Sequence, residues 1–172
     1  MKRLFFSLII SLFFSTGVFA AKAMDTDFER QIAKKMIDSS IQRFKIEEDV
    51  SIDDAIESMK LRANMLNFKL VADLPLSDQI KSMGKESNHM QILAFCDALI
   101  AKEMVEYNII FAGFLPCRIA AVEDKDGQGW LVTTNMDMML HAVELPDHLK
   151  PLAKKVRDTI YSIIDAGVTG DL

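Results

Sequence analysis

The segment from Met90 to Asn135, MQILAFCDALIAKEMVEYNIIFAGFLPCRIAAVEDKDGQGWLVTTN, decides the fold of this chain. It contains both cysteines, the only tryptophan and the clearest hairpin signal. Residues 90–96 alternate along the chain and become apolar on both faces toward their end, which predicts a buried strand. Asp97 is a suitable N-cap for the helix that follows, and we expect this helix to stop at Asn108.

The second half of the segment predicts a β-hairpin. The run 109–116 is apolar but contains a glycine and a proline, so we expect an irregular connection there. Residues 117–124 then alternate as a strand does. Asp126-Gly127 supplies the glycine that a tight turn with positive φ requires, and an alternating run around Trp130 forms the second strand.

On the N-terminal side of this segment, the pattern is helix, strand and short helix. Ser51 and Asp54 form a capping pattern, and apolar residues recur at helical spacing up to Leu66. Residues 67–73 read as a strand, and the short helix after it ends at Gly84.

Amphipathic helices are predicted at both ends of the mature chain. Residues 24–44 form an N-terminal amphipathic helix that we expect to pack on the domain, although an edge strand within 43–50 is an alternative for its end. The last helix opens at Pro146, with Gly167 as its expected cap and residues 168–172 as a fraying tail.

The chain shows no internal repeat, low-complexity run or linker. We therefore predict a single α+β domain over residues 45–172, including the C-terminal helix. The expected architecture is a two-layer sandwich with an antiparallel or mixed sheet covered by helices, to which the N-terminal helix is added.

The first residues have the pattern of a secretory signal peptide, which we assign to 1–23. Two basic residues precede a short apolar run, and small residues follow it, with cleavage expected after Ala20 or Ala23. A membrane anchor is the alternative, but the run is short and interrupted by polar residues, whereas spanning needs about 20 apolar residues. We expect a periplasmic protein with no membrane span after cleavage.

The charge of the chain excludes some partners. Lys and Arg number 20 against 25 Asp and Glu, a net charge of −5, and cleavage after Ala20 removes two of the basic residues. Nucleic acid is therefore not an expected partner, because binding it depends on clustered Lys and Arg that neutralise phosphates.

The phrase 114–119, FLPCRI, and the acidic hairpin around Glu123 to Gly127 resemble a family known as domain of unknown function 302. The resemblance covers roughly Phe44 to His141. Within it, Phe95-Cys96-Asp97 and Pro116-Cys117-Arg118 are similar to an exported bacterial branch. The resemblance implies a compact two-layer α+β domain and no established activity.

Cys96, Cys117 and Arg118 are the first candidate binding or redox residues. Two cysteines in an exported chain suggest a disulfide. Parallel neighbouring strands would place these two at opposite ends of the sheet, whereas they could meet if the apolar run 109–116 carries the chain back. Inert buried thiols and a redox or metal role are the alternatives. Arg118 could lower the pKa of Cys117 or hold an anion.

A copper ion is the cofactor that the sequence suggests, with Cys117, Met136, Met138 and His141 as its ligands. Thiolate, thioether and imidazole groups suit copper, and the run MDMMLH at 136–141 follows the hairpin closely. The alternative is that these methionines fill the core, because methionine occurs throughout the chain.

The sequence favours a non-enzymatic function. We predict binding of a small ligand, a metal ion or a protein partner in the cell envelope, with the Cys117 region as the site. The alternatives are a thiol-based or copper-linked redox protein that uses Cys117 with Cys96, and a structural subunit of an envelope complex.

Overall fold

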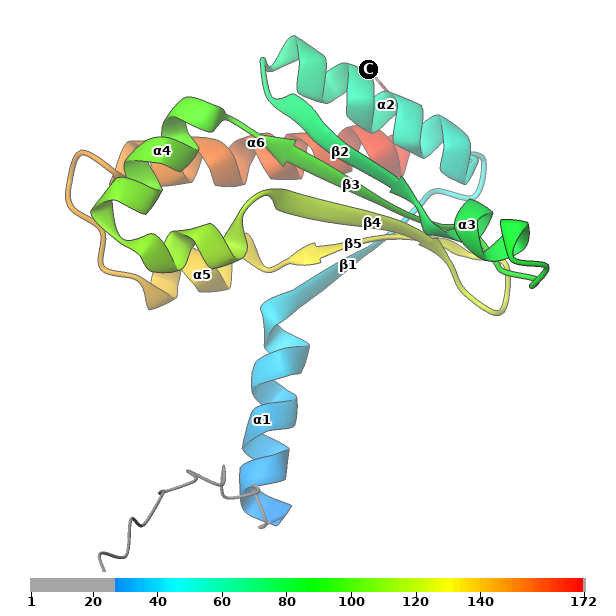
Figure 1. Cartoon of the computed structure of the whole chain (residues 1–172), viewed down its shortest axis with the longest axis horizontal. Helices are drawn as coiled ribbons and strands as arrows, with labels where there is room; N and C mark the ends of the chain where they lie inside the picture. The colour runs from blue at the N-terminus through cyan, green and yellow to red at the C-terminus, as the bar shows by residue number, and fades with distance from the viewer. Residues whose placement is uncertain (1–26, 172) are drawn as a thin grey trace, which may run out of the picture.

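The computed structural model describes residues 27–171 and shows a five-stranded antiparallel sheet with its main helices on one face (Figure 1). The strand order is β1-β5-β4-β3-β2. The strands are β1 (Ile41–Lys45), β2 (Lys69–Pro75), β3 (Met90–Cys96), β4 (Cys117–Glu123) and β5 (Gly129–Thr134). The helices are α1 (Asp27–Ser40), α2 (Ile52–Met65), α3 (Leu76–Ser82), α4 (Ala98–Tyr107), the 3₁₀ helix η1 (Ile109–Phe114), α5 (Met136–Ala142) and α6 (Lys150–Thr169).

The predicted α+β two-layer sandwich is confirmed, and its sheet is antiparallel throughout. β4 pairs with β3 on one side and with β5 on the other, so the segment that decides the fold forms the centre of the sheet. The turn between β4 and β5 contains Gly127 at φ 82°, as the Asp126-Gly127 pair predicted.

The core lies between the sheet and the pair α2 and α6. Side chains that alternate along the central strands fill it, because successive residues of a strand point to opposite faces. Leu93, Phe95, Ile119 and Leu131 have no exposed surface. The other face of the sheet carries no helix of this layer, and α1 leaves the sheet on that side (Figure 1).

Two predicted helix starts are confirmed by their hydrogen bonds. The Ser51 hydroxyl accepts a bond from the Asp54 N–H at 3.1 Å. The Asp97 carboxylate accepts bonds from the N–H groups of Leu99 and Ile100. These bonds satisfy donors that a helix leaves unpaired at its first turn.

The predicted C-terminal cap at Gly167 is wrong, and residues 168 and 169 are helical rather than frayed. α6 continues past Gly167 to Thr169, and Gly170 at φ 72° ends it. Gly167 instead allows close packing, since a Cβ there would lie 2.7 Å from Met59 Cγ and 2.8 Å from Leu131 Cδ1. The glycine therefore lets α6 approach both α2 and the sheet.

The N-terminal helix differs from its predicted form. It ends at Ser40, where we expected residue 44, because residues 41–45 pair with β5 as the edge strand of the sheet. None of its residues is buried, so it projects from the domain instead of packing on it (Figure 1).

The predicted signal peptide at 1–23 lies outside the described residues. Within residues 27–171, no helix combines the length and the apolar character that crossing a bilayer requires.

Candidate functional site

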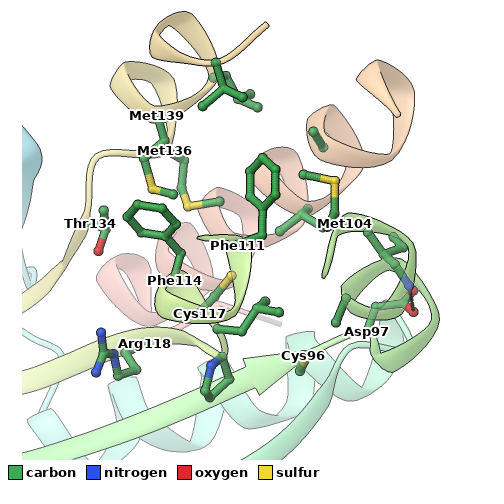
Figure 2. Close-up of a pocket in the computed structure, with 18 of the residues that line it drawn as sticks. Cys96, Asp97, Met104, Phe111, Phe114, Cys117, Arg118, Thr134, Met136 and Met139 are labelled. Carbon is green, nitrogen blue, oxygen red and sulfur yellow. Dashed lines mark hydrogen bonds between the residues drawn. The ribbon is translucent and has the colours of Figure 1, made fainter. Parts of the chain in front are cut away.

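A pocket of about 110 Å³ lies at the end of the sheet where β3 stops and β4 begins. We call it the Cys117 pocket. Its walls come from β4, α4, η1, α5 and α6, so segments distant in sequence enclose it. Figure 2 shows Phe111, Phe114, Met136 and Met139 gathered around the same space as Cys117.

The walls of the pocket are mainly apolar. Phe111 is 8% exposed and Met136 is 9% exposed, and Ala101, Leu140, Val143 and Val156 add aliphatic surface. Phe114 also lines the pocket and is 47% exposed. The pocket is thus suited to an apolar molecule.

Cys96 and Cys117 are free thiols in this structure, and both line the pocket. Cys117 pairs directly with Phe95 across β3 and β4, so their side chains share one face. Cys96 is the next residue along β3, and its side chain therefore points to the other face. The two cysteines form no disulfide in this structure.

Burial raises the pKa of the Cys117 thiol to about 11, with a further contribution from nearby Cys96. Burial also raises the pKa of Cys96, and Asp97 adds to this effect. Arg118 is not among the causes of this shift, and the pKa of Cys117 is raised rather than lowered. Both cysteines stay protonated near neutral pH, which makes them poor nucleophiles.

Arg118 and Thr134 lie together at one side of the pocket (Figure 2). They occupy opposite positions on β4 and β5, one step beyond the pair Ile119 and Thr133. Arg118 is exposed, and within residues 27–171 its guanidinium has neither a hydrogen bond nor an ion pair. The structure thus places an unpaired cation at the edge of an apolar pocket, on the face of β4 opposite to Cys117.

The predicted copper ligands are divided by the structure. Cys117 and Met136 line the pocket, together with Met139, whereas Met138 and His141 do not line it. Helical spacing explains this division, because residues 136, 139 and 140 of α5 share one face. His141 is exposed, and its Nδ1 lies 2.7 Å from the Asp137 carbonyl oxygen.

Sequence reasoning did not identify Met104, Phe111 and Phe114 as site residues. Met104 lies within the predicted helix, and its apolar spacing was consistent with an ordinary core position. Among residues 27–171, no three His, Cys, Asp or Glu side chains are grouped to hold a metal ion. The sulfur atoms of the pocket therefore offer soft ligands, and the one carboxylate that lines the pocket, Asp97, already accepts hydrogen bonds from the Leu99 and Ile100 N–H groups.

The acidic hairpin at the opposite end of the sheet has a structural role. The Asp124 carboxylate accepts bonds from Trp130 Nε1 at 2.8 Å and from the N–H groups of Asp126 and Gln128. These bonds, the one from Trp130 above all, hold the pKa of Asp124 below its ordinary value. A carboxylate bound in this way is committed to the turn and is not available as a general base.

Comparison with known proteins identifies a family without an assigned activity. The model of the family described as "Domain of unknown function DUF302" matches residues 44–167. The crystal structure of an uncharacterized conserved DUF302 protein from Bacillus stearothermophilus is similar in fold, with a TM-score of 0.59 and 17% sequence identity. The alignment covers 73% of this chain and 95% of that chain. No curated protein matches the sequence. The chain belongs to the DUF302 family.

Proposed function

We propose that this protein is a non-enzymatic binding protein of the cell envelope, and that a small apolar acid is its ligand. The observation that carries this proposal is the Cys117 pocket, about 110 Å³ in volume and mainly apolar. A water molecule occupies roughly 30 Å³, and an apolar cavity of about 150 Å³ takes benzene. The pocket is thus of a size for one ring or a short aliphatic chain.

Arg118 supports an acidic group on the ligand. A guanidinium binds a carboxylate through two parallel hydrogen bonds, and such charge-assisted bonds are stronger than neutral ones. Arg118 has no competing partner within residues 27–171 and stands at the pocket edge beside Thr134. A carboxylate at Arg118 would leave the apolar part of the ligand directed into the pocket.

Titration calorimetry with hexanoate and benzoate, compared with hexan-1-ol and benzyl alcohol, tests this function. We expect the acids to bind more tightly than the alcohols. Arg118→Gln should weaken acid binding by roughly 10-fold or more, from the loss of a charged hydrogen bond, and leave the alcohols unchanged. Arg43→Gln is the matched control, because Arg43 is exposed on β1 and does not line the pocket.

A second pair of variants tests whether the pocket is the binding site. Ala101→Phe should fill the pocket and abolish binding of acids and alcohols alike. Ala112→Phe is its control, because Ala112 is exposed on η1 and does not line the pocket. Absence of binding at millimolar ligand, or binding that Ala101→Phe leaves intact, would exclude the proposed function.

Copper(I) binding is a second candidate, favoured by the five sulfur-containing side chains that line the pocket: Cys96, Met104, Cys117, Met136 and Met139. A thiol with a pKa near 11 must lose its proton to the metal, which lowers metal affinity at neutral pH. Cu(I) retained against a chelator by the native chain, but not by a Cys117→Ser, Met136→Leu variant, would support this candidate.

The envelope location rests on the pattern of residues 1–23. The intact mass of protein recovered from the periplasm tests it. We expect the mass of a chain whose first residue is 21 or 24. The mass of a chain that still carries the signal would contradict export.

A further inference from the structure

The helix α1 exposes an apolar stripe that no other described part of the chain covers. Phe28, Met36 and Ile37 are 70%, 59% and 65% exposed, and Ile32 is 43% exposed. The stripe continues into Ile41, the first residue of β1, which is also 43% exposed. Large apolar side chains that are exposed to solvent next to one another mark an interaction site.

The open face of the sheet carries an apolar row across its central strands, and register places Arg43 and Lys45 of β1 and Arg118 of β4 on the same face beside this row. Across the strands, Val132 pairs with Ala120, Ala120 with Ile92, and Ile92 with Leu74. The pair Trp130 and Val122 lies beside this row on the same face. The side chains of this row on β3, β4 and β5 point away from α2 and α6, because their neighbours Leu93, Ile119 and Leu131 fill the core.

The junction between α1 and β1 keeps the helix away from its own sheet. Ser40 ends the helix and Ile41 begins the strand, with no linker between them. Asn135 fixes this junction, since its N–H donates to the Ser40 carbonyl at 2.8 Å and its Nδ2 donates to the Ser39 carbonyl at 3.0 Å. The helix therefore cannot fold back onto the open face of the same chain.

We propose that a second copy of this chain covers both surfaces, with α1 of each copy lying across the open sheet face of the other about a two-fold axis. The dimensions agree: 14 residues of helix span about 21 Å, and five strands spaced by about 4.8 Å span about 19 Å. In this two-fold arrangement, the apolar stripe of α1 and the open sheet face are covered in both copies.

The expected interface is of modest size. A contact along a helix face about 21 Å long and about 10 Å wide buries on the order of 500 Å² of solvent-accessible surface, counted over the helix and the sheet together. Two such contacts reach about 1,000 Å², the lower bound for a specific interface. The dimer should therefore dissociate at micromolar concentration rather than persist at nanomolar concentration.

The charges of α1 favour a protein partner over an anionic membrane. The helix carries three acidic residues and three basic residues, so its net charge is zero. Helices that bind anionic lipid gain affinity from an excess of Lys and Arg. The helix, which ends at Ser40, also lies entirely before the region that the family model matches, which begins at residue 44. The dimer is thus a property of this chain beyond the shared domain.

Sedimentation velocity at 1–200 µM tests the proposal, with the chain from which only the predicted signal peptide has been removed. We expect a monomer–dimer equilibrium that Ile32→Glu shifts to monomer by at least 10-fold in dissociation constant. Gln31→Glu is the matched control: it adds the same charge at the adjacent position on the polar side of α1 and should leave the dimer intact. Neither position is buried, so neither variant should unfold the domain.

A photo-crosslinker at Ile37 identifies the opposing surface. In a mixture of ¹⁴N and ¹⁵N protein, we expect mixed-isotope crosslinks to strands β3, β4 and β5. A monomer at 200 µM, a dimer insensitive to Ile32→Glu, or crosslinks to α2 or α6 would overturn the proposal. A monomer that binds phosphatidylglycerol vesicles through α1 would also overturn it and assign the stripe to a membrane.

Discussion

At the hairpin end of the sheet the Asp124 carboxylate accepts three hydrogen bonds, whereas at the opposite end the Arg118 guanidinium has no polar partner within residues 27–171. The hairpin end is also held by Gln128, whose Nε2 donates to the Ile46 and Gly129 carbonyls. The Cys117 end instead contains an apolar pocket. Satisfied polar groups stabilise a fold, while an unpaired charge beside a cavity remains available to a ligand.

The largest expected effect concerns thiol reactivity at the Cys117 end. A pKa raised from about 9 to about 11 lowers the thiolate fraction about 100-fold at neutral pH. Native Cys117 should therefore react with iodoacetamide at least 100-fold more slowly than glutathione at pH 7.5. Peptide mass spectrometry over a time course measures this rate.

Denatured protein alkylated without reductant is the control for this experiment. Both cysteines should be labelled, since both are free thiols in the structure. A Cys117 that reacts as fast as glutathione would place the site among activated thiols and restore the redox alternative. An unlabelled chain whose mass is two hydrogens below that of the chain with two free thiols would show a disulfide instead.

The second prediction concerns stability at alkaline pH. The unfolded chain loses the Cys117 proton near the ordinary pKa of about 9, while the folded protein keeps it to about 11. The stability that this thiol contributes is thus fully present below pH 9 and is lost as the pH rises to 11, by roughly 2 kcal/mol. Urea unfolding from pH 8 to 10.5 should show a steeper decline for the native chain than for Cys117→Ala. Equal slopes would contradict the burial argument.

The third prediction compares a glycine at each end. Gly127→Ala should destabilise by about 1–2 kcal/mol, because its φ of 82° is strained for any residue with a Cβ. Gly113→Ala on η1 meets no atom within 4 Å and should be neutral or slightly stabilising. Urea denaturation measures both variants. An equal loss of unfolding free energy in the two variants would contradict the prediction that the hairpin turn is more sensitive to a Cβ than η1 is.

The central segment allowed most of the sheet to be predicted. Period-two alternation at 90–96 and 117–124 and the Asp126-Gly127 turn are local signals, and they specify strands and a hairpin without tertiary information. Asp97 marked the start of α4 for the same reason. The N-terminal helix was predicted too long, because the pairing of residues 41–45 with β5 is not visible in a local pattern.

The pocket could be predicted only in part. Cys117 and Met136 were identified from their chemistry, but the facing residues Met104 and Phe114 lie in elements whose packing depends on the whole fold. The relation between the cysteines depended on strand register: a pairing of Cys117 with Phe95 rather than Cys96 turns the two thiols to opposite faces. The local pattern predicts Gly167 as a cap, because the close approach of Met59 is a tertiary contact that no local pattern contains.

The smallest expected effect concerns Asp124 at acid pH. Its pKa is lowered in the folded protein, chiefly by the bond from Trp130, so its contribution to stability is present above the ordinary carboxyl pKa near 4. This contribution is lost as the pH falls through the lower folded pKa. The native chain should therefore exceed Asp124→Asn in urea midpoint at pH 7, and the difference should shrink below pH 4. Asp126→Asn removes a charge from the same turn and is the control. A difference that persists unchanged at pH 3 would mean that the turn depends on the shape of Asp124 rather than on its charge.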